Sequence, residues 1–187
     1  IHRSNAAEGL AGPPPMNKLS RLLPSIFFVA LSAVASSGFQ QSAPATFRLT
    51  VSGDVEHSLS LSLDDLKKMP HTTLTVTNPH EKKDQTFEGV PLEELLKQAG
   101  APLGPKLRGP AMATYVIAEA VDGYRVIYSL AELDSDFQDS GVIVADAMDG
   151  KPMGDTLGPL RLVAPHDKRP ARWIRMLQSI KVVTVAK

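Results

Sequence analysis

The stretch DGKPMGDTLGPLRLVAPHDKRPARWIRMLQSIKVV, residues Asp149–Val183, is the part of the sequence that says most about the fold. It opens with an Asp-Gly turn, and an apolar strand is predicted over Leu160–Ala164. A basic loop, His166–Arg172, comes next, and another apolar strand is predicted over Ile180–Val185. The segment therefore predicts two buried strands that hold a positively charged loop between them.

Working outward from this segment, short strands are predicted along most of the chain. Apolar residues that alternate with polar ones indicate half-buried strands, and two pairs of these have the spacing of β-hairpins. The predicted strands cover residues 47–51, 59–63, 72–77, 114–120, 124–128 and 142–147.

Only a few short helices are predicted. Ser62 can cap one of them, Pro91 opens a second with Gly100 past its end, and a third short helix is predicted over 129–133. Residues 78–85 are polar and are predicted to form a loop. Strands and helices do not alternate regularly, so the pattern favours an α+β fold with mixed β-sheets and a few short helices.

The composition excludes several classes of function. Of the 187 residues 43% are hydrophobic, enough for a core, and the twenty basic residues balance the twenty acidic ones. This balance gives no support for a nucleic-acid partner. The chain has no cysteine, which excludes disulfides, thiol catalysis and cysteine zinc sites. The histidines have no metal-ligand spacing, and the sequence holds neither a nucleophile elbow nor a phosphate-binding loop motif.

The N-terminal part is predicted to lie outside the folded domain. Residues 1–15 are expected to be an upstream extension, and Met16–Ala35 has the basic start, apolar run and small-residue cleavage site of a secretory signal peptide. The apolar run is shorter than the roughly 20 residues of a membrane span, which favours a cleaved signal peptide. The alternative is an uncleaved segment that anchors the chain in the membrane. Residues 36–46 are expected to be a linker and residues 47–187 the folded domain. The protein is expected to be periplasmic in a bacterium, or secreted.

Five motifs in the same order resemble the molybdopterin-binding domain of sulfite-oxidase-type oxidoreductases. In that family a strand L-x-[IV]-x-G-x-V and a short helix ending in [LM]-P come first. A G-V-P-L helix start, a D-G-Y hairpin and a closing segment like the one quoted above follow. The matching segments here are Leu49–Val55, Ser62–Pro70, Phe87–Leu92, Asp122–Tyr124 and Asp149–Val183. The resemblance implies a sulfite-oxidase-like α+β fold and a possible molybdopterin cofactor.

Two departures from the family argue against molybdenum chemistry. The family holds its metal through a cysteine, and the corresponding position falls at or near Thr77, whose hydroxyl does not replace a soft, anionic thiolate. Phe87 stands where the family has tryptophan. In addition, family members that carry the cofactor leave the cytoplasm folded, by the twin-arginine route. Met16–Arg21 has no adjacent arginine pair, so the signal does not indicate export of a chain that already carries the cofactor.

The basic loop supplies one group of candidate binding residues. The resemblance places its counterpart near the pterin phosphate, so His166, Lys168, Arg169 and Arg172 are candidates for binding a dianion through charge-assisted hydrogen bonds. The alternative is a solvated loop whose Arg172 packs on Trp173.

A second group follows Thr77. Asn78 and His80, with Lys82 and Lys83 beside them, correspond to a family loop that contacts cofactor or substrate; the alternative is an exposed loop tip. Arg161 lies inside an apolar strand and is predicted to bond a carboxylate or the backbone, because buried charges are normally paired.

These features predict a periplasmic protein of the molybdopterin-binding type that does not run redox chemistry. It is expected to bind an anionic small molecule or a partner protein through the two loops, without a bound metal or cofactor and without nucleic acid. Two alternatives stay open: an active molybdopterin-dependent oxidoreductase with coordination by a residue other than cysteine, and a protein-interaction module.

Overall fold

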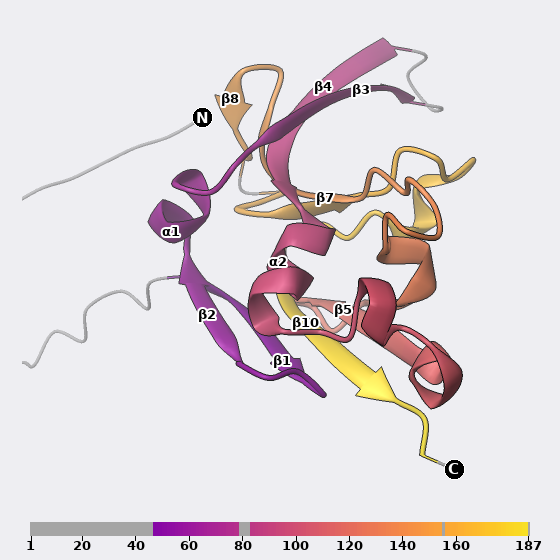
Figure 1. Ribbon diagram of the computed structural model, residues 1–187. Helices are drawn as coiled ribbons and strands as arrows, with labels where there is room; N and C mark the ends of the chain where they lie inside the picture. The colour runs from indigo at the N-terminus through magenta and orange to yellow at the C-terminus, as the bar shows by residue number, and fades with distance from the viewer. Residues whose placement is uncertain (1–46, 79–82, 155, 187) are drawn as a thin grey trace, which may run out of the picture. The chain divides into compact units, whose positions relative to one another are not determined.

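The computed structural model describes residues 47–78, 83–154 and 156–186 (Figure 1). The predicted extension, signal peptide and linker lie outside these residues, as do His80 and Lys82. The helices are α1 (Leu63–Lys67) and α2 (Leu92–Ala99). The strands are β1 (Arg48–Gly53), β2 (Leu59–Ser62), β3 (Thr72–Asn78), β4 (Lys83–Pro91), β5 (Thr114–Ala120), β6 (Arg125–Ser129), β7 (Ile143–Met148), β8 (Lys151–Pro152), β9 (Arg161–Val163) and β10 (Leu177–Thr184).

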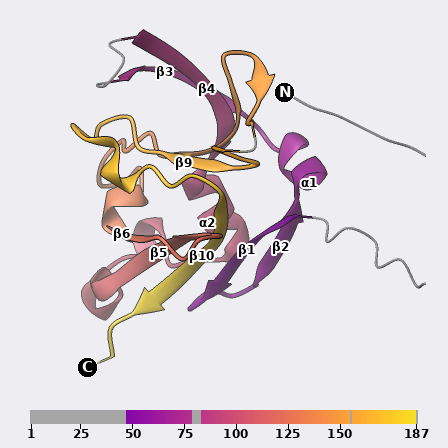
Figure 2. The same ribbon diagram turned by 180° about the vertical axis from the view of Figure 1, so that it is seen from behind.

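The strands form two sheets. One has the order β2-β1-β10-β5-β6, in which β1 runs parallel to β10 and the other neighbours are antiparallel. The other has the order β3-β4-β7-β8, and β9 also pairs with β7. With only two short α-helices among the described residues, this arrangement confirms the predicted α+β fold with mixed sheets (Figures 1 and 2).

Helix α2 and both sheets contribute to a single hydrophobic core. Helix α2 contacts β1 of the first sheet and β4 of the second, and its leucines are fully buried. Burial of this apolar surface is the main favourable term in folding. Core side chains from the two sheets and the helix include Leu49, Val51, Phe87, Val90, Leu92, Leu96, Val116, Tyr128, Val144, Leu162, Ile180 and Val182.

The helix ends follow the predicted signals closely. At α1 the hydroxyl of Ser62 accepts a hydrogen bond from the backbone N–H of Asp65, whose carboxylate accepts one from the N–H of Ser62, which makes a capping box. Helix α2 ends at Gly100, which has φ 73°, a left-handed conformation that glycine adopts without strain. Pro91 is the residue before this helix rather than its first residue.

The prediction of a loop over residues 78–85 is wrong at both ends. Asn78 is the last residue of β3 and pairs with Lys83, the first residue of β4. The hairpin continues through polar residues because their side chains can remain in water while the backbone groups pair across the two strands. The predicted helix over 129–133 is a 3₁₀ turn, Ala131–Leu133, with Ser129 and Glu132 bonded to one another at its start.

His71, the residue before β3, connects this strand to β7. Nε2 of His71 lies 3.3 Å from the Asp146 carboxylate, and Nδ1 lies 2.8 Å from the carbonyl oxygen of Met69. Burial opposes protonation of His71, but the hydrogen bonds to Met69 and Asp146, together with the charges of Asp146 and Glu88, outweigh it and raise its pKa above 6.5.

A raised histidine pKa makes stability depend on pH in a defined direction. The stabilisation from His71 is fully present below the unfolded-state pKa of 6.5 and is lost as pH rises through the higher folded-state pKa. We expect the free energy of unfolding to fall by less than about 1 kcal/mol across this range, since the pair is partly solvated. Urea unfolding of the wild type and His71→Gln on both sides of the transition tests this. A pH dependence that persists unchanged in the variant would show that another group causes it.

Candidate functional site

A cavity of about 380 Å³ lies between β3 and the basic loop. Thr75, Val76 and Thr77 line one side, and Pro165–Lys168 lines the other, with Pro170 and Trp173 completing the wall. The structure thus brings the threonine at the expected metal-ligand position next to two of the predicted anion-binding residues, His166 and Lys168.

Arg172 organises the basic loop from within. Its Nε and Nη2 atoms donate to the two oxygens of Asp167 at 2.9 and 2.6 Å, and its Nη1 donates to Glu132 at 2.6 Å. The guanidinium also lies over the ring of Tyr128, 4.4 Å from the centroid, and not over Trp173. Three of its five N–H groups already donate to two carboxylates, so Arg172 holds the loop in place and is less available to a ligand than an unpaired cation.

The pairing of Arg172 leaves the remaining positive charge of the loop on two other residues. Lys168 and Arg169 are exposed, and neither has an ion pair within the part of the chain that the structure describes. Asp167, the acid between them and His166, is occupied by Arg172. Lys168 lines the cavity, and Arg169 is its neighbour along the loop.

Arg161 has an environment that the sequence did not predict. Its guanidinium carbon lies 5.4 Å from the ring centroids of both Phe87 and Trp173, whose rings meet edge to face. Its buried Nε has no hydrogen-bond partner among the described residues. The predicted bond to a carboxylate or the backbone is therefore wrong for this atom: two aromatic faces take that place, and burial, with the charge of Arg175, lowers the Arg161 pKa.

Arg161 is also the functional candidate that sequence reasoning undervalued. Trp173 lines the cavity and also contacts the guanidinium of Arg161, so one side chain connects Arg161 to the cavity. A partly buried cation with no carboxylate partner among the described residues raises the positive potential nearby, because the low-dielectric interior screens it weakly. An arginine in an otherwise apolar strand was the available signal.

The residues at the end of β3 do not suit a transition metal. The hydroxyl of Thr77 donates to the Asp84 carboxylate at 2.7 Å on an exposed part of the hairpin. Within residues 47–78, 83–154 and 156–186, no group of three or more histidine, aspartate or glutamate side chains is arranged to hold a metal ion. Asn78 pairs with Lys83 at the end of the hairpin, and His80 lies outside the described residues.

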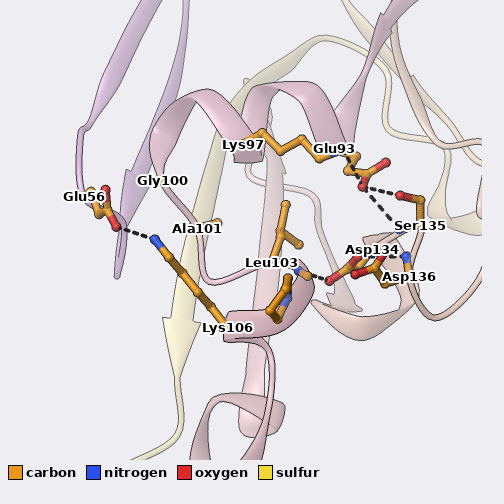
Figure 3. A pocket seen from close by; sticks show the side chains of 12 residues that line it. Glu56, Glu93, Lys97, Gly100, Ala101, Leu103, Lys106, Asp134, Ser135 and Asp136 are labelled. Atoms are coloured by element: carbon orange, nitrogen blue, oxygen red, sulfur yellow. Dashed lines mark hydrogen bonds and ion pairs between the residues drawn. The ribbon is translucent and has the colours of Figure 1, made fainter.

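A second cavity of about 380 Å³ lies beside the end of α2, and both lysines that line it are already paired with glutamates (Figure 3). Lys106 pairs with Glu56 at 3.0 Å and Lys97 with Glu93 at 2.9 Å. Asp134 is buried and accepts hydrogen bonds from the backbone N–H groups of Gly104 and Asp136. The cavity beside β3 is consequently the better candidate for a ligand site.

A mixed sheet and an antiparallel sheet around one core define the class of protein as an α+β domain. The chain belongs to the oxidoreductase molybdopterin binding domain family, whose model matches residues 36–187. This confirms the resemblance predicted from the five ordered motifs.

One solved structure illustrates the shared fold. The sulfane dehydrogenase SoxCD from Paracoccus pantotrophus superposes with a TM-score of 0.57 at 22% sequence identity, over 73% of this chain and 38% of that chain. The chain therefore corresponds to well under half of that protein's length. A comparison with curated proteins gave no match. In the described residues no helix is both long and apolar enough to span a membrane.

Proposed function

We propose that this family member binds an anionic small molecule in the cavity beside β3 and does not run molybdenum redox chemistry. The observation that carries the proposal is that some charged side chains around the cavity have an ion-pair partner and others do not. The one acid of the basic loop is occupied by Arg172, whereas Lys168 and Arg169 keep no carboxylate partner among the described residues.

The residues present fit the anionic part of a molybdopterin-type ligand better than its metal. A phosphate or carboxylate group in the cavity would meet Lys168 and His166 directly, and the field of Arg161, which contacts Trp173, would add to the attraction. The metal has no thiolate here, because the chain has no cysteine, and Thr77, at or near the family's cysteine position, donates a hydrogen bond to Asp84. No redox step is therefore assigned to this chain.

The proposal also places the protein in the bacterial periplasm. Its support is the signal-like pattern of Met16–Ala35, which lies outside the described residues and has no adjacent arginine pair before its apolar run. A general secretory signal exports an unfolded chain, so a cofactor loaded in the cytoplasm would not travel with it.

Removing the two unpaired cations tests the proposed site. In Lys168→Gln/Arg169→Gln, we expect the affinity for inorganic phosphate or sulfate to fall about ten-fold or more, because a charge-assisted contact and a neighbouring positive charge are lost. Titration calorimetry at low ionic strength measures this, since salt screens exposed charges.

A matched variant controls for net charge. Lys181→Gln/Arg108→Gln removes one lysine and one arginine that are exposed and lie outside the residues lining the cavity. Its affinity should stay within about two-fold of the wild type. Equal weakening in both double variants would mean that the anion responds to total charge and not to this cavity. If the wild type binds no oxyanion, the proposed anion site is wrong and the alternative of a protein-interaction module is favoured.

A further inference from the structure

Strand β3 is an open edge of its sheet. It pairs along its whole length with β4 and has no other strand neighbour among the described residues (Figures 1 and 2). Natural edge strands are usually short, charged, interrupted by proline or covered. The sequence Thr72–Asn78, TTLTVTN, is long for an edge strand and has neither charge nor proline. It therefore offers an unprotected row of backbone groups.

The hydrogen bonds of β4 show which groups of β3 face outward. Thr86 of β4 turns its backbone toward the β7 side: its N–H donates to the Asp149 carboxylate, and its carbonyl accepts from the Asp149 N–H. Its partner across the hairpin, Thr75, thus belongs to a non-hydrogen-bonded pair, so the N–H and C=O of Thr75 point away from β4. Because this direction alternates, Thr73 and Thr77 also present theirs to the open edge.

The cavity lies against this same strand. Three consecutive residues of β3, Thr75–Thr77, line the cavity. Because successive side chains of a strand point to opposite faces of the sheet, at least one of the three meets the cavity beside its backbone. The opposite wall is the basic loop, with Lys168 among its lining residues. The space is a groove with hydrogen-bonding backbone on one side and positive charge on the other.

We propose that the groove binds an extended acidic peptide segment, which adds to β3 as a further strand. Backbone pairing with Thr73, Thr75 and Thr77 supplies the hydrogen bonds, and alternate acidic side chains reach Lys168 and Arg169. The inference rests on the proposed function, because the same two cations bind the anion in both. A second copy of this chain fits less well, since edge-to-edge pairing of two β3 strands would bring two basic loops together.

N-methylated peptides test the strand addition directly. The probe is acetyl-Glu-Thr-Glu-Thr-Glu-amide. Because glutamates and threonines alternate, all three glutamate side chains lie on one face of the added strand. One isomer carries N-methyl groups on its threonines and another on its second and third glutamates. Only the amides that face β3 are needed for pairing, so one isomer should bind the full-length protein about ten-fold more weakly and the other about as well as the parent. The amides of Thr73, Thr75 and Thr77 should gain hydrogen-exchange protection with the parent peptide.

The outcomes separate this inference from the proposed function. Equal binding of the parent and both isomers, with loss in Lys168→Gln/Arg169→Gln, would overturn strand addition while the anion site stands. Binding of phosphate but of none of the peptides would overturn it as well. If neither phosphate nor peptide binds, both proposals fall. Concentration-dependent protection of the β3 amides without peptide would identify a second copy as the occupant and contradict an acidic peptide partner.

Discussion

Gly89→Ala is expected to lower the free energy of unfolding by about 3 kcal/mol or more, the upper end of the range for overpacked cores. An alanine Cβ at this position would meet the carbonyl oxygen of Val144 and come within 2.5 Å of the Cα of Ala145. Both atoms belong to the backbone of β7, at the point where the pairing of β4 and β7 shifts register between Glu88 and Gly89. A side chain could move away, but a paired central strand cannot do so without breaking its hydrogen bonds.

Urea unfolding followed by circular dichroism measures this effect, and Gly154→Ala provides the matched control. No atom lies within 4 Å of a Cβ built on Gly154, so that variant should stay within about 0.5 kcal/mol of the wild type. Similar stability in the two alanine variants would contradict the close approach of β4 and β7. The prediction also explains the glycine of the G-V-P-L motif in this chain, because only a residue without Cβ fits there.

Arg172→Ala is expected to lower the free energy of unfolding by about 2 kcal/mol, after allowance for the partial exposure of the side chain. The substitution removes three hydrogen bonds to carboxylates and the contact with Tyr128, and it leaves Asp167 and Glu132 without their partner. Asp167 would then lie beside Lys168 as a free acid, so oxyanion binding should also weaken even though Arg172 does not contact the anion.

Arg125→Ala is the matched control for this effect. Arg125 makes a single ion pair with Glu119 and its side chain is 63% exposed, so its loss should cost no more than about 0.5 kcal/mol and leave oxyanion affinity unchanged. Denaturation and phosphate titration of both variants provide the comparison. An Arg172→Ala protein with wild-type stability but lost binding would show instead that Arg172 contacts the anion itself, as predicted from the sequence.

Much of the fold was predictable because its signals are local. The capping box of Ser62 and Asp65, the glycine at position 100 and the alternation in β5 and β6 each depend on residues close together in the sequence. The hairpin of β3 and β4 was predicted too short, because backbone pairing extended it through polar residues that carry no hydrophobic pattern.

The location of the candidate site could be predicted from the sequence, but the partners of its charged side chains could not. The sequence indicated that the basic loop and the end of β3 belong together, and the structure places His166 and Lys168 across a cavity from Thr77. The partners of each charge depend on tertiary contacts: Arg172 finds Glu132 forty residues away in sequence, and Arg161 finds two aromatic rings in place of an acid. No sequence spacing contains that information.

The molybdenum content of the protein, purified from the cell envelope of the organism that makes it, tests the central claim most directly. Elemental analysis, with the amount of chain determined on the same sample, gives the number of metal atoms per chain. We predict no molybdenum in a folded sample, because Thr77 supplies no thiolate. About one molybdenum per chain, the stoichiometry of a single metal site, would contradict the account and establish coordination by a residue other than cysteine.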